Sequence, residues 1–397
     1  MVLGGRILGE DAQMTMQMDI NKSSMELHKR HGGKIETVSK VKLDSGEAMS
    51  MAYTPGVAEV SRVIAEAPSL VREYTLKQNT IAIVSDGSAV LGLGNIGALA
   101  AIPVMEGKAA IFKEFAGVDA FPICLDTQDT EEIIKAVKLI APVFGGINLE
   151  DISAPRCFEI ERRLREELSI PVMHDDQWGA ATVNLAGVIN ALKLTRQPKE
   201  DVKVVISGVG AAGVATGRLL NIYGIRDILY IDSKGIIHPG RKELTAEKQE
   251  MINESTAEPF EGTLADAIKG RNIFIGLSKP GLVTQDMVRS MADKPIIFAL
   301  ANPVPEILPD EAFEAGAYIV ATGRSDFPNQ LNNSLVFPGA FKGMLENNIP
   351  QFKTEMFSSI GQAIADAVVD LSPAKIIPTM FESNVVTAVK GAIKRYK

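Results

Sequence analysis

The sequence has little of what marks secreted, membrane-spanning or nucleic-acid-binding proteins. Its 397 residues include only two cysteines, Cys124 and Cys157, which excludes a disulfide framework and fits a reducing cytoplasm. The apolar stretch of residues 90–105 is too short and too rich in glycine for a membrane span. The net charge of −8 argues against a nucleic-acid surface. No secretory signal is visible, since Glu10 and Asp11 precede any apolar run. We therefore expect a soluble, cytoplasmic protein.

Histidine is also scarce, and its spacing does not indicate a metal site. The four histidines are His28, His31, His174 and His238. His174 precedes an acidic pair, but strand alternation directs its side chain to the opposite face, so we do not expect it to be a ligand.

The length and the order of predicted elements indicate two α/β domains. An apolar content of 46% is ordinary for a soluble protein, and 397 residues suffice for two cores. Strand-like and helix-like segments alternate from residue 57, stop at a polar stretch near residue 197, and begin again, which predicts parallel sheets with crossover helices. We predict a flexible or tag-like segment 1–30, a catalytic domain 31–175, a Rossmann-type domain 176–340, and C-terminal helices 341–397 that pack back on the first domain.

Two acidic doublets follow neighbouring predicted strands of the first domain. Glu150 and Asp151 end one strand, Asp175 and Asp176 end the next, and a single helix separates them. Two parallel strands joined by one helix end at the same edge of a sheet, so the doublets should meet there. Carboxylates gathered in this way indicate Mg²⁺ or Mn²⁺. Helix capping is the alternative, but it accounts for one acid per doublet and not for two.

Two segments match the Gly-x-Gly-x-x-Gly pattern, and their contexts differ. The segment Gly208-Val-Gly210-Ala211-Ala212-Gly213 follows an apolar strand, opens a helix and is followed by Asp232 at the end of the next strand. This context predicts a dinucleotide site, with the acid on the ribose hydroxyls. The segment Gly92–Gly97 has no such acid. We therefore interpret this segment as a glycine-rich turn and not as a nucleotide site. The same turn is also a candidate lining of a substrate pocket.

Several longer motifs together resemble the malic enzyme family, in its short bacterial form. The resemblance covers nearly the whole chain from about residue 30. It rests on YTPGVA (53–58), SDGSAVLGLGNIG (85–97), MEGKAAIFKEFAGVDAFPICLDT (105–127), NLEDI (148–152), HDDQWGAA (174–181), GVGAAG (208–213), ANPVPE (301–306) and NQLNNSLVFPG (329–339). It implies oxidative decarboxylation of L-malate to pyruvate and CO₂, with a nicotinamide cofactor, a divalent metal and at least a homodimer.

The resemblance also implies roles for individual residues. The metal ligands fall on Glu150, Asp151 and Asp176, the catalytic lysine on Lys108 with Asp175 beside it, and the catalytic tyrosine on Tyr53. The cofactor site extends to Ser278 and Asn302, and the substrate site takes in Asn302, Asn332 and Asn333.

Each of these residues also has a structural explanation that involves no catalytic role. A base for the C2 hydroxyl must be partly neutral at working pH. Desolvation and a nearby cation would lower the pKa of Lys108 enough for this role. The alternative is that Lys108 is a surface residue, as most lysines are. Tyr53 suits the proton donor at C3, yet Tyr-Thr-Pro-Gly is also typical of a turn. Asn302 and Asn333 are likewise common turn residues.

The sequence departs from relatives at two positions and leaves the cofactor open. Trp178 stands where short relatives often carry histidine. Ala89 stands where longer relatives carry a malate-binding arginine, so Ser88 or the amides of the Gly92–Gly97 loop are expected to hold the substrate carboxylate. Asp232 favours NAD, whereas Lys234 and Lys279 are placed to offset a 2′-phosphate and so to permit NADP.

We expect an NAD(P)-dependent malic enzyme whose partners are malate, oxaloacetate and pyruvate. Two rivals remain at this point. One is an oxaloacetate decarboxylase of the same family without net redox chemistry. The other is a non-catalytic nucleotide sensor, against which the intact acidic set argues.

Overall fold

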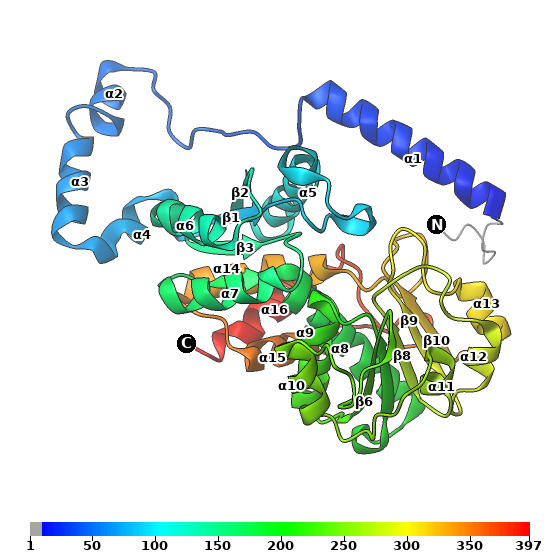
Figure 1. Ribbon diagram of the computed structural model, residues 1–397. Helices are drawn as coiled ribbons and strands as arrows, with labels where there is room; N and C mark the ends of the chain where they lie inside the picture. Colours follow the sequence, from blue (N-terminus) through cyan, green and yellow to red (C-terminus); the bar gives the residue numbers. More distant parts are fainter. Residues whose placement is uncertain (1–9) are drawn as a thin grey trace.

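A computed structural model of the chain describes residues 10–397 and contains two sheets (Figure 1). The first sheet is fully parallel, with order β2-β1-β3-β4. Its strands are β1 (Thr80–Ser85), β2 (Asp119–Cys124), β3 (Gly146–Leu149) and β4 (Val172–His174). Its crossover helices are α5 (Gly97–Ala116), α6 (Thr130–Ile140) and α7 (Arg156–Glu167).

The second sheet has order β10-β9-β8-β5-β6-β7 and is parallel except for the short β7. Its strands are β5 (Lys203–Ser207), β6 (Asp227–Asp232), β7 (Gly235–Ile236), β8 (Ile273–Gly276), β9 (Ile296–Ala299) and β10 (Ile319–Thr322). Its helices are α9 (Ala211–Tyr223), α10 (Ala246–Glu254), α11 (Leu264–Ile268), α12 (Gln285–Arg289) and α13 (Pro309–Glu314). The predicted two-domain α/β architecture is confirmed.

These strands form because their residues are apolar on both faces. Every residue of β8 and β9 is buried, as expected for parallel strands covered by helices on both sides. The two sheets are joined by α8 (Asp175–Thr195), whose residues are nearly all buried. A helix that is apolar all round packs in a core. It lies against α9 and against α15 (Thr354–Asp366).

The C-terminal helices close the core beneath the first sheet. Besides α15, they are α14 (Phe337–Asn347) and α16 (Val385–Lys394), and α14 packs on α5. The rings of Phe112 and Phe337 lie 4.7 Å apart at this contact. α14, the first of these helices, begins at Phe337.

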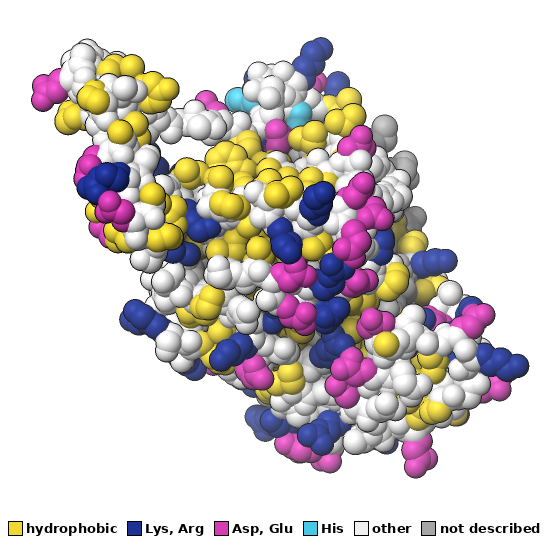
Figure 2. All heavy atoms as spheres, turned by 60° about the vertical axis from the view of Figure 1, so that its left-hand side comes forward, with side chains coloured by type: hydrophobic (Ala, Val, Ile, Leu, Met, Phe, Trp, Pro, Cys, Tyr) yellow, Lys and Arg dark blue, Asp and Glu magenta, His cyan; other side chains and the backbone are white. Residues whose placement is uncertain are grey.

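An N-terminal arm extends away from both sheets (Figures 1 and 2). We use this name for residues 35–79, which hold α2 (Gly46–Ala52), α3 (Val57–Glu66) and α4 (Val71–Tyr74). None of these three helices has a buried residue. Before the arm, the segment predicted to be flexible is helical from its tenth residue, as α1 (Glu10–His31). Residues 1–9 of that segment lie outside the described residues.

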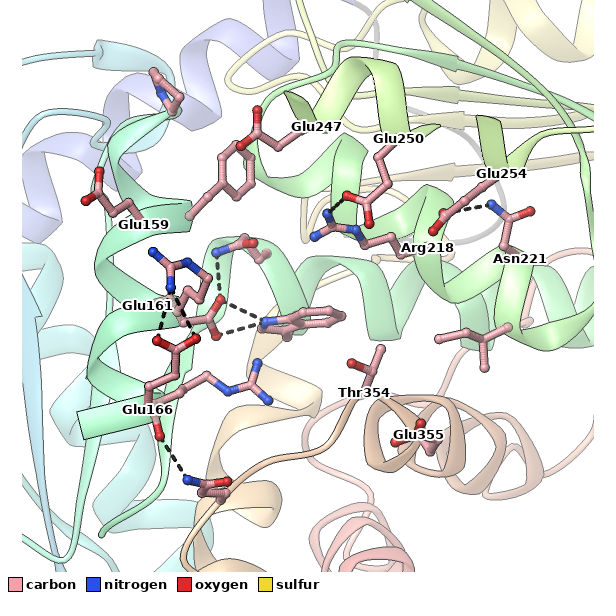
Figure 3. A pocket seen from close by; sticks show the side chains of 18 of the residues that line it. Glu159, Glu161, Glu166, Arg218, Asn221, Glu247, Glu250, Glu254, Thr354 and Glu355 are labelled. Atoms are coloured by element: carbon pink, nitrogen blue, oxygen red, sulfur yellow. Dashed lines mark hydrogen bonds and ion pairs between the residues drawn. The ribbon is translucent and has the colours of Figure 1, made fainter. Parts of the chain in front are cut away.

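Short 3₁₀ turns connect several of these elements. The turns are η1 (Pro68–Leu70), η2 (Leu76–Asn79), η3 (Leu91–Leu93), η4 (Ala141–Val143), η5 (Lys199–Asp201) and η6 (Asn333–Leu335). A groove of about 1420 Å³ runs between α7, α9, α10 and α15 (Figure 3). Over residues 10–397, every helix is too short or too polar to cross a membrane.

Candidate active site

The two acidic doublets meet at the carboxyl edge of the first sheet. β3 ends at Leu149 and β4 at His174, so both doublets follow directly, and α8 begins at Asp175. Carboxylate oxygens of Glu150, Asp151 and Asp176 lie within 4.8 Å of one another. We call these three residues the carboxylate cluster. Three carboxylates at this spacing are a donor set suited to Mg²⁺ or Mn²⁺. Neither α7 nor α8 has a side-chain cap, so capping does not account for the acids.

Lys108 lies beside the carboxylate cluster and not at the surface. It is 7% exposed, its Nζ is 2.6 Å from Glu150 Oε2, and it also pairs with Asp175. Burial lowers its pKa, but the negative charges of Asp175 and Glu150 outweigh burial and raise the pKa above the ordinary lysine value. The sequence predicted a lowered pKa for Lys108, but without a bound cation the pKa is raised.

The site carries more negative charge than Lys108 balances. Burial raises the pKa of Glu150 well above its usual range, and neighbouring Asp176 and Asp175 raise it further despite Lys108. Burial likewise raises the pKa of Asp175. Crowded, buried carboxylates are relieved by positive charge, so the residues present fit a divalent cation.

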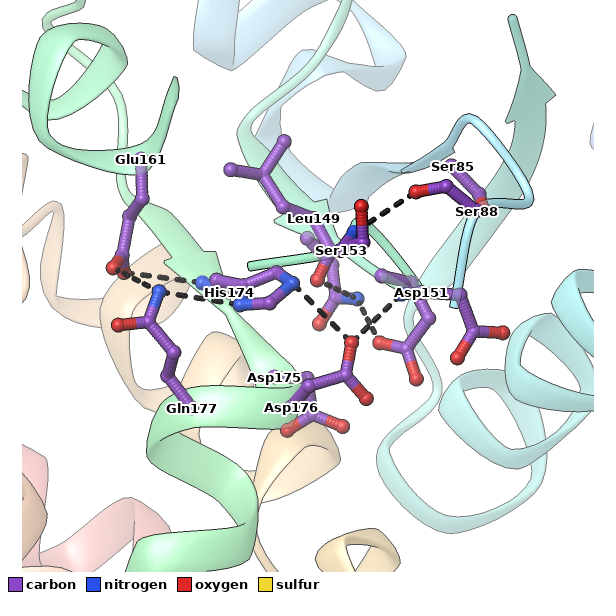
Figure 4. Close-up of polar contacts among 12 residues, drawn as sticks. Ser85, Ser88, Leu149, Asp151, Ser153, Glu161, His174, Asp175, Asp176 and Gln177 are labelled. Carbon is purple, nitrogen blue, oxygen red and sulfur yellow. Dashed lines mark hydrogen bonds and ion pairs between the residues drawn. The ribbon is translucent and has the colours of Figure 1, made fainter. Parts of the chain in front are cut away.

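Neighbouring groups hold Asp176 (Figure 4) and also Glu150 in place. The Asp151 backbone N–H donates to Asp176 Oδ2 at 2.7 Å, and His174 Nε2 lies 3.2 Å from the same oxygen. Asn148 Nδ2 donates to Glu150 Oε2 at 3.0 Å. The expectation that His174 points away from the acids is wrong: it is fully buried and contacts Asp176. It stands outside the carboxylate cluster, as expected, but directly behind it.

The hydroxyl of Ser88 is engaged in fixing loops. Ser88 Oγ donates to Asp86 Oδ1 at 2.6 Å and accepts from the Ser153 backbone N–H at 2.9 Å and from Arg156 Nη2 at 3.0 Å. Its single hydrogen is thus used on Asp86. This leaves the amides of the Gly92–Gly97 loop as the better candidates for a substrate carboxylate.

The Gly92–Gly97 loop reaches the second domain. A Cβ on Gly92 would lie 2.2 Å from the carbonyl oxygen of Asn302, so only glycine allows this approach. Asn302 itself is exposed, and its side chain lies beside Gly323. The loop therefore connects the edge of the first sheet with the loop after β9.

Asn333 is the first residue of η6, which packs on α8, and Asn332 is its N-cap. A Cβ on Gly179 would meet Asp175 Oδ1 at 1.9 Å and Asn333 Cβ at 3.0 Å. Asn333 is thus close to the Lys108–Asp175 pair. Asn332 Oδ1 accepts from the Ser334 backbone N–H at 2.8 Å, which caps η6.

The first glycines after β5 form a cradle that suits a pyrophosphate. β5 lies between β6 and β8, where the strand order reverses and dinucleotides bind. Gly208 has φ +102°, and a Cβ on Gly213 would lie 1.9 Å from Gly208 O. A Cβ on Gly210 would meet nothing within 4 Å, so this side is open to a ligand. α9 begins at Ala211, followed by Ala212, and has no side-chain cap at its N-terminus.

Glu306, which the motif analysis left without a role, supports this cradle. It is fully buried and accepts from the backbone N–H groups of Ser278 at 3.1 Å and Ala301 at 3.0 Å. It therefore fixes the loops after β8 and β9, where Ser278 and Asn302 lie. The acid at the end of ANPVPE is the sequence signal for this role.

Comparison with known proteins identifies this combination of sites. The malic enzyme N-terminal domain matches residues 32–165, and the malic enzyme NAD binding domain matches residues 178–393. The chain belongs to the malic enzyme family.

Similar malic enzymes include an NAD-dependent one from Geobacillus stearothermophilus, 52% identical over 94% of this chain and 78% of the relative. A bifunctional malic/malolactic enzyme of Bacillus subtilis is 50% identical over 95% and 93%. The crystal structure of an NAD-dependent malic enzyme from Thermotoga maritima has a TM-score of 0.90 and 48% identity, covering 93% and 98%. NADP-dependent malic enzymes are also similar, at 40–46% identity.

In this malic enzyme the acid expected to bind the ribose is already paired. Arg241 donates to both oxygens of Asp232, at 2.9 and 2.8 Å, and Lys248 Nζ donates to Oδ2 at 2.7 Å. Burial opposes the charge of Asp232, but the hydrogen bonds from Arg241 and Lys248 prevail and lower its pKa to about 2. Lys234 gives Asp232 its backbone N–H, while its side chain pairs with Glu243.

The tyrosine expected at the active site lies elsewhere in this chain. Tyr53 follows α2 in the N-terminal arm and is 66% exposed. α2 stands apart from α5, which carries Lys108, and from the carboxyl edge of the first sheet (Figure 1). Within one chain, the structure does not bring Tyr53 to the other predicted catalytic residues.

Proposed function

We propose that the chain catalyses the oxidative decarboxylation of L-malate to pyruvate and CO₂, with reduction of NAD or NADP and with Mg²⁺ or Mn²⁺. The observation that carries this proposal is the carboxylate cluster beside the buried Lys108, on a sheet edge whose Gly92–Gly97 loop touches Asn302 on the cofactor side. Family membership supports the same reaction.

Each residue then has a chemical role. Lys108, oriented by Asp175, takes the proton of the C2 hydroxyl as the hydride leaves C2. When bound, the cation supplies a Lewis acid for the C2 oxygen and the nicotinamide accepts the hydride. Asn333, close to Asp175, is placed to orient the substrate. Lys108 becomes a competent base once positive charge on its carboxylate neighbours offsets their pull on its proton.

Tyr53 serves this reaction as the acid that protonates C3 after CO₂ leaves, and it does so from a second copy of the chain. Several apolar side chains of the N-terminal arm are more than half exposed: Val38, Val41, Leu43 and Met51. Short helices without buried residues gain stability only by packing on another surface. Hydrophobic side chains gather on the arm and on the adjoining face of the body (Figure 2). A symmetric dimer covers these surfaces and delivers Tyr53 to the partner's site.

A turnover assay tests the function. The purified protein is incubated with L-malate, Mn²⁺ and either NAD or NADP, and reduced cofactor is followed by absorbance. We expect malate-dependent reduction that stops with EDTA. Oxaloacetate consumption without malate oxidation would indicate a decarboxylase, and cofactor binding without metal dependence would indicate a nucleotide sensor.

Mixing two inactive variants tests the second copy. Lys108→Ala and Tyr53→Phe are combined under conditions that exchange subunits. If Tyr53 acts on the partner's site, half of the dimers are mixed and each has one intact site, so activity returns to about a quarter of wild type. If Tyr53 acts within its own chain, mixing restores nothing.

We also propose a cytoplasmic location. Cys124 and Cys157 are both free thiols, as expected for a reducing compartment.

A further inference from the structure

Behind the carboxylate cluster lies a buried acid that takes no part in the proposed chemistry. Glu161 projects from α7, is 4% exposed, and forms none of the ion pairs recorded over residues 10–397. Three neutral N–H groups stabilise it: the backbone of His174 at 3.1 Å, Gln177 Nε2 at 2.9 Å and Trp178 Nε1 at 2.9 Å. A buried carboxylate without a cation is costly, so its retention requires a reason.

The contacts of Glu161 fix the side-chain amide of Gln177. Gln177 Nε2 lies 2.9 Å from Glu161 Oε2 and 3.2 Å from His174 Nδ1. Turning the amide over would place its oxygen against the Glu161 carboxylate, where two acceptors repel each other. Gln177 therefore presents an N–H group to His174 Nδ1.

This arrangement decides where the ring of His174 carries its hydrogen. Because Nδ1 faces a donor, it must be the acceptor nitrogen, and the hydrogen lies on Nε2. Nε2 is the atom that lies 3.2 Å from Asp176 Oδ2 (Figure 4). The Asp151 backbone N–H donates to the same oxygen, so Oδ1 is left to face a cation. The chain of contacts runs from Glu161 through Gln177 and His174 to Asp176.

We propose that Glu161, Gln177 and His174 are positioning residues that set the metal affinity of the site by holding the Asp176 carboxylate in its ligating orientation. The proposal rests on the proposed function in taking Asp176 as a metal ligand. Outer partners of metal ligands typically change metal affinity by about 10- to 100-fold when they are lost.

Glu161, which lies behind the carboxylate cluster, also lines the groove between α7 and α15. Glu161, Gln177 and Trp178 line this groove (Figure 3). Trp178 is the single tryptophan of the chain, and its ring stacks on Phe357 with centroids 4.9 Å apart. Its indole N–H is bound to Glu161, so its fluorescence reports on the acid directly.

Calorimetric titration of the full-length protein with Mn²⁺ tests the proposal. His174→Phe removes the donor and keeps a ring, and we expect the Kd for Mn²⁺ to rise about 10- to 100-fold. His174→Gln restores an N–H group near the position of Nε2, so most of the affinity should return. Glu161→Gln frees the amide of Gln177 and should weaken binding by about tenfold. Affinity for NAD serves as the check on folding and should not change.

Glu166→Gln is the matched control, because Glu166 lies on the same helix, is exposed, and pairs with Arg162 away from His174. The Kd for Mn²⁺ should stay at the wild-type value in this variant. A double variant Glu161→Gln/His174→Phe should bind Mn²⁺ no more weakly than His174→Phe alone, since both changes act on one path.

The outcomes separate this proposal from the proposed function. If wild type binds Mn²⁺ and Glu161→Gln and His174→Phe bind it equally well, the positioning role is overturned and the malic enzyme reaction stands. If wild type binds no Mn²⁺, the proposed function itself fails. Titration of wild type with Mg²⁺ should shift the emission of Trp178, and the Glu161→Gln variant should lose this shift. Should His174→Phe fail to fold, Glu161→Gln and His174→Gln still decide the question.

Discussion

The carboxylate cluster and the N-terminal arm are opposite kinds of surface. At the cluster, polar side chains are packed against one another: Lys108 contacts Glu150, and His174 contacts Asp176. On the arm, apolar side chains are exposed, with Val41 at 58% and Met51 at 67%. Buried charge and exposed apolar surface both cost free energy unless something else covers or balances them.

The difference shows what each region requires. The cluster lacks only positive charge, which a small cation supplies. The arm lacks a covering surface, which only a macromolecule supplies, and the one proposed is a second copy of the chain. A complete catalytic site therefore needs both additions, and substitutions in the two regions should fail in different ways.

The largest expected effect is at the cluster. Lys108→Met removes the base and should lower kcat by about 10²- to 10⁴-fold. It also leaves Glu150 and Asp175 without their buried counter-charge, at a cost of about 3–5 kcal/mol in unfolding free energy. Thermal and urea unfolding measure this loss. Lys108→Arg is the control: it keeps the charge, so it should recover stability while staying inactive, because arginine does not deprotonate.

Tyr53→Phe should reduce kcat comparably but leave stability unchanged. The phenol is 66% exposed in the single chain, so no buried partner is lost. Assays of kcat, Mn²⁺ affinity and molar mass, side by side, check this. A variant that turns over malate at the wild-type rate would remove Tyr53 from the mechanism.

Asp176→Asn tests a direct ligand against its positioning residues. Because the amide has one neutral oxygen in place of a carboxylate, the Kd for Mn²⁺ should rise by more than about 100-fold, beyond the range of outer partners. Activity at saturating Mn²⁺ should return in part. An unchanged metal dependence would contradict its place in the carboxylate cluster.

The sequence predicted the framework of the cluster but not its surroundings. Apolar runs such as β8 and β9 are readable because they are buried on both faces. The meeting of Glu150 and Asp176 follows from parallel strands. The contact of His174 was missed because strand alternation ends where α8 begins, at Asp175. The partners of Asp232 lie 9 and 16 residues along the chain with no period to reveal them. The distance of Tyr53 from Lys108 depends on the direction in which the N-terminal arm extends from the two sheets. This direction is set by long-range packing, so no local sequence pattern predicts it.

A smaller effect is expected from the arm's apolar side chains. Val41→Asp places a charge where the second copy would pack and loses about 1.5–3 kcal/mol of apolar burial per side chain. Light scattering during gel filtration should show a shift towards monomer, with activity falling at low protein concentration and recovering at high concentration. Val369→Asp is the control, since Val369 is 57% exposed outside the arm. Equal behaviour of the two variants would count against the arm as an interface.

The smallest expected effect concerns the choice between NAD and NADP. It is expected at a third region, around Asp232, where opposite charges are paired. Asp232 lies at the end of β6 with Arg241 and Lys248 bound to it, so negative and positive charge lie together at the position where the sequence predicts the ribose. The carboxylate opposes a 2′-phosphate, while the two cations attract one. With the charges paired, we expect NAD to be preferred and NADP to be used more slowly.

Asp232→Asn should reverse part of that preference. It removes the repulsion and leaves Arg241 and Lys248 available to a phosphate, so the ratio of kcat/KM for NADP to that for NAD should rise about tenfold, equivalent to ~1.4 kcal/mol. Arg241→Ser should move the ratio the other way, because it leaves Asp232 less well balanced. Steady-state kinetics with both cofactors at saturating malate and Mn²⁺ measure the two shifts. If both substitutions change the ratio in the same direction, the paired charges do not determine the choice of cofactor.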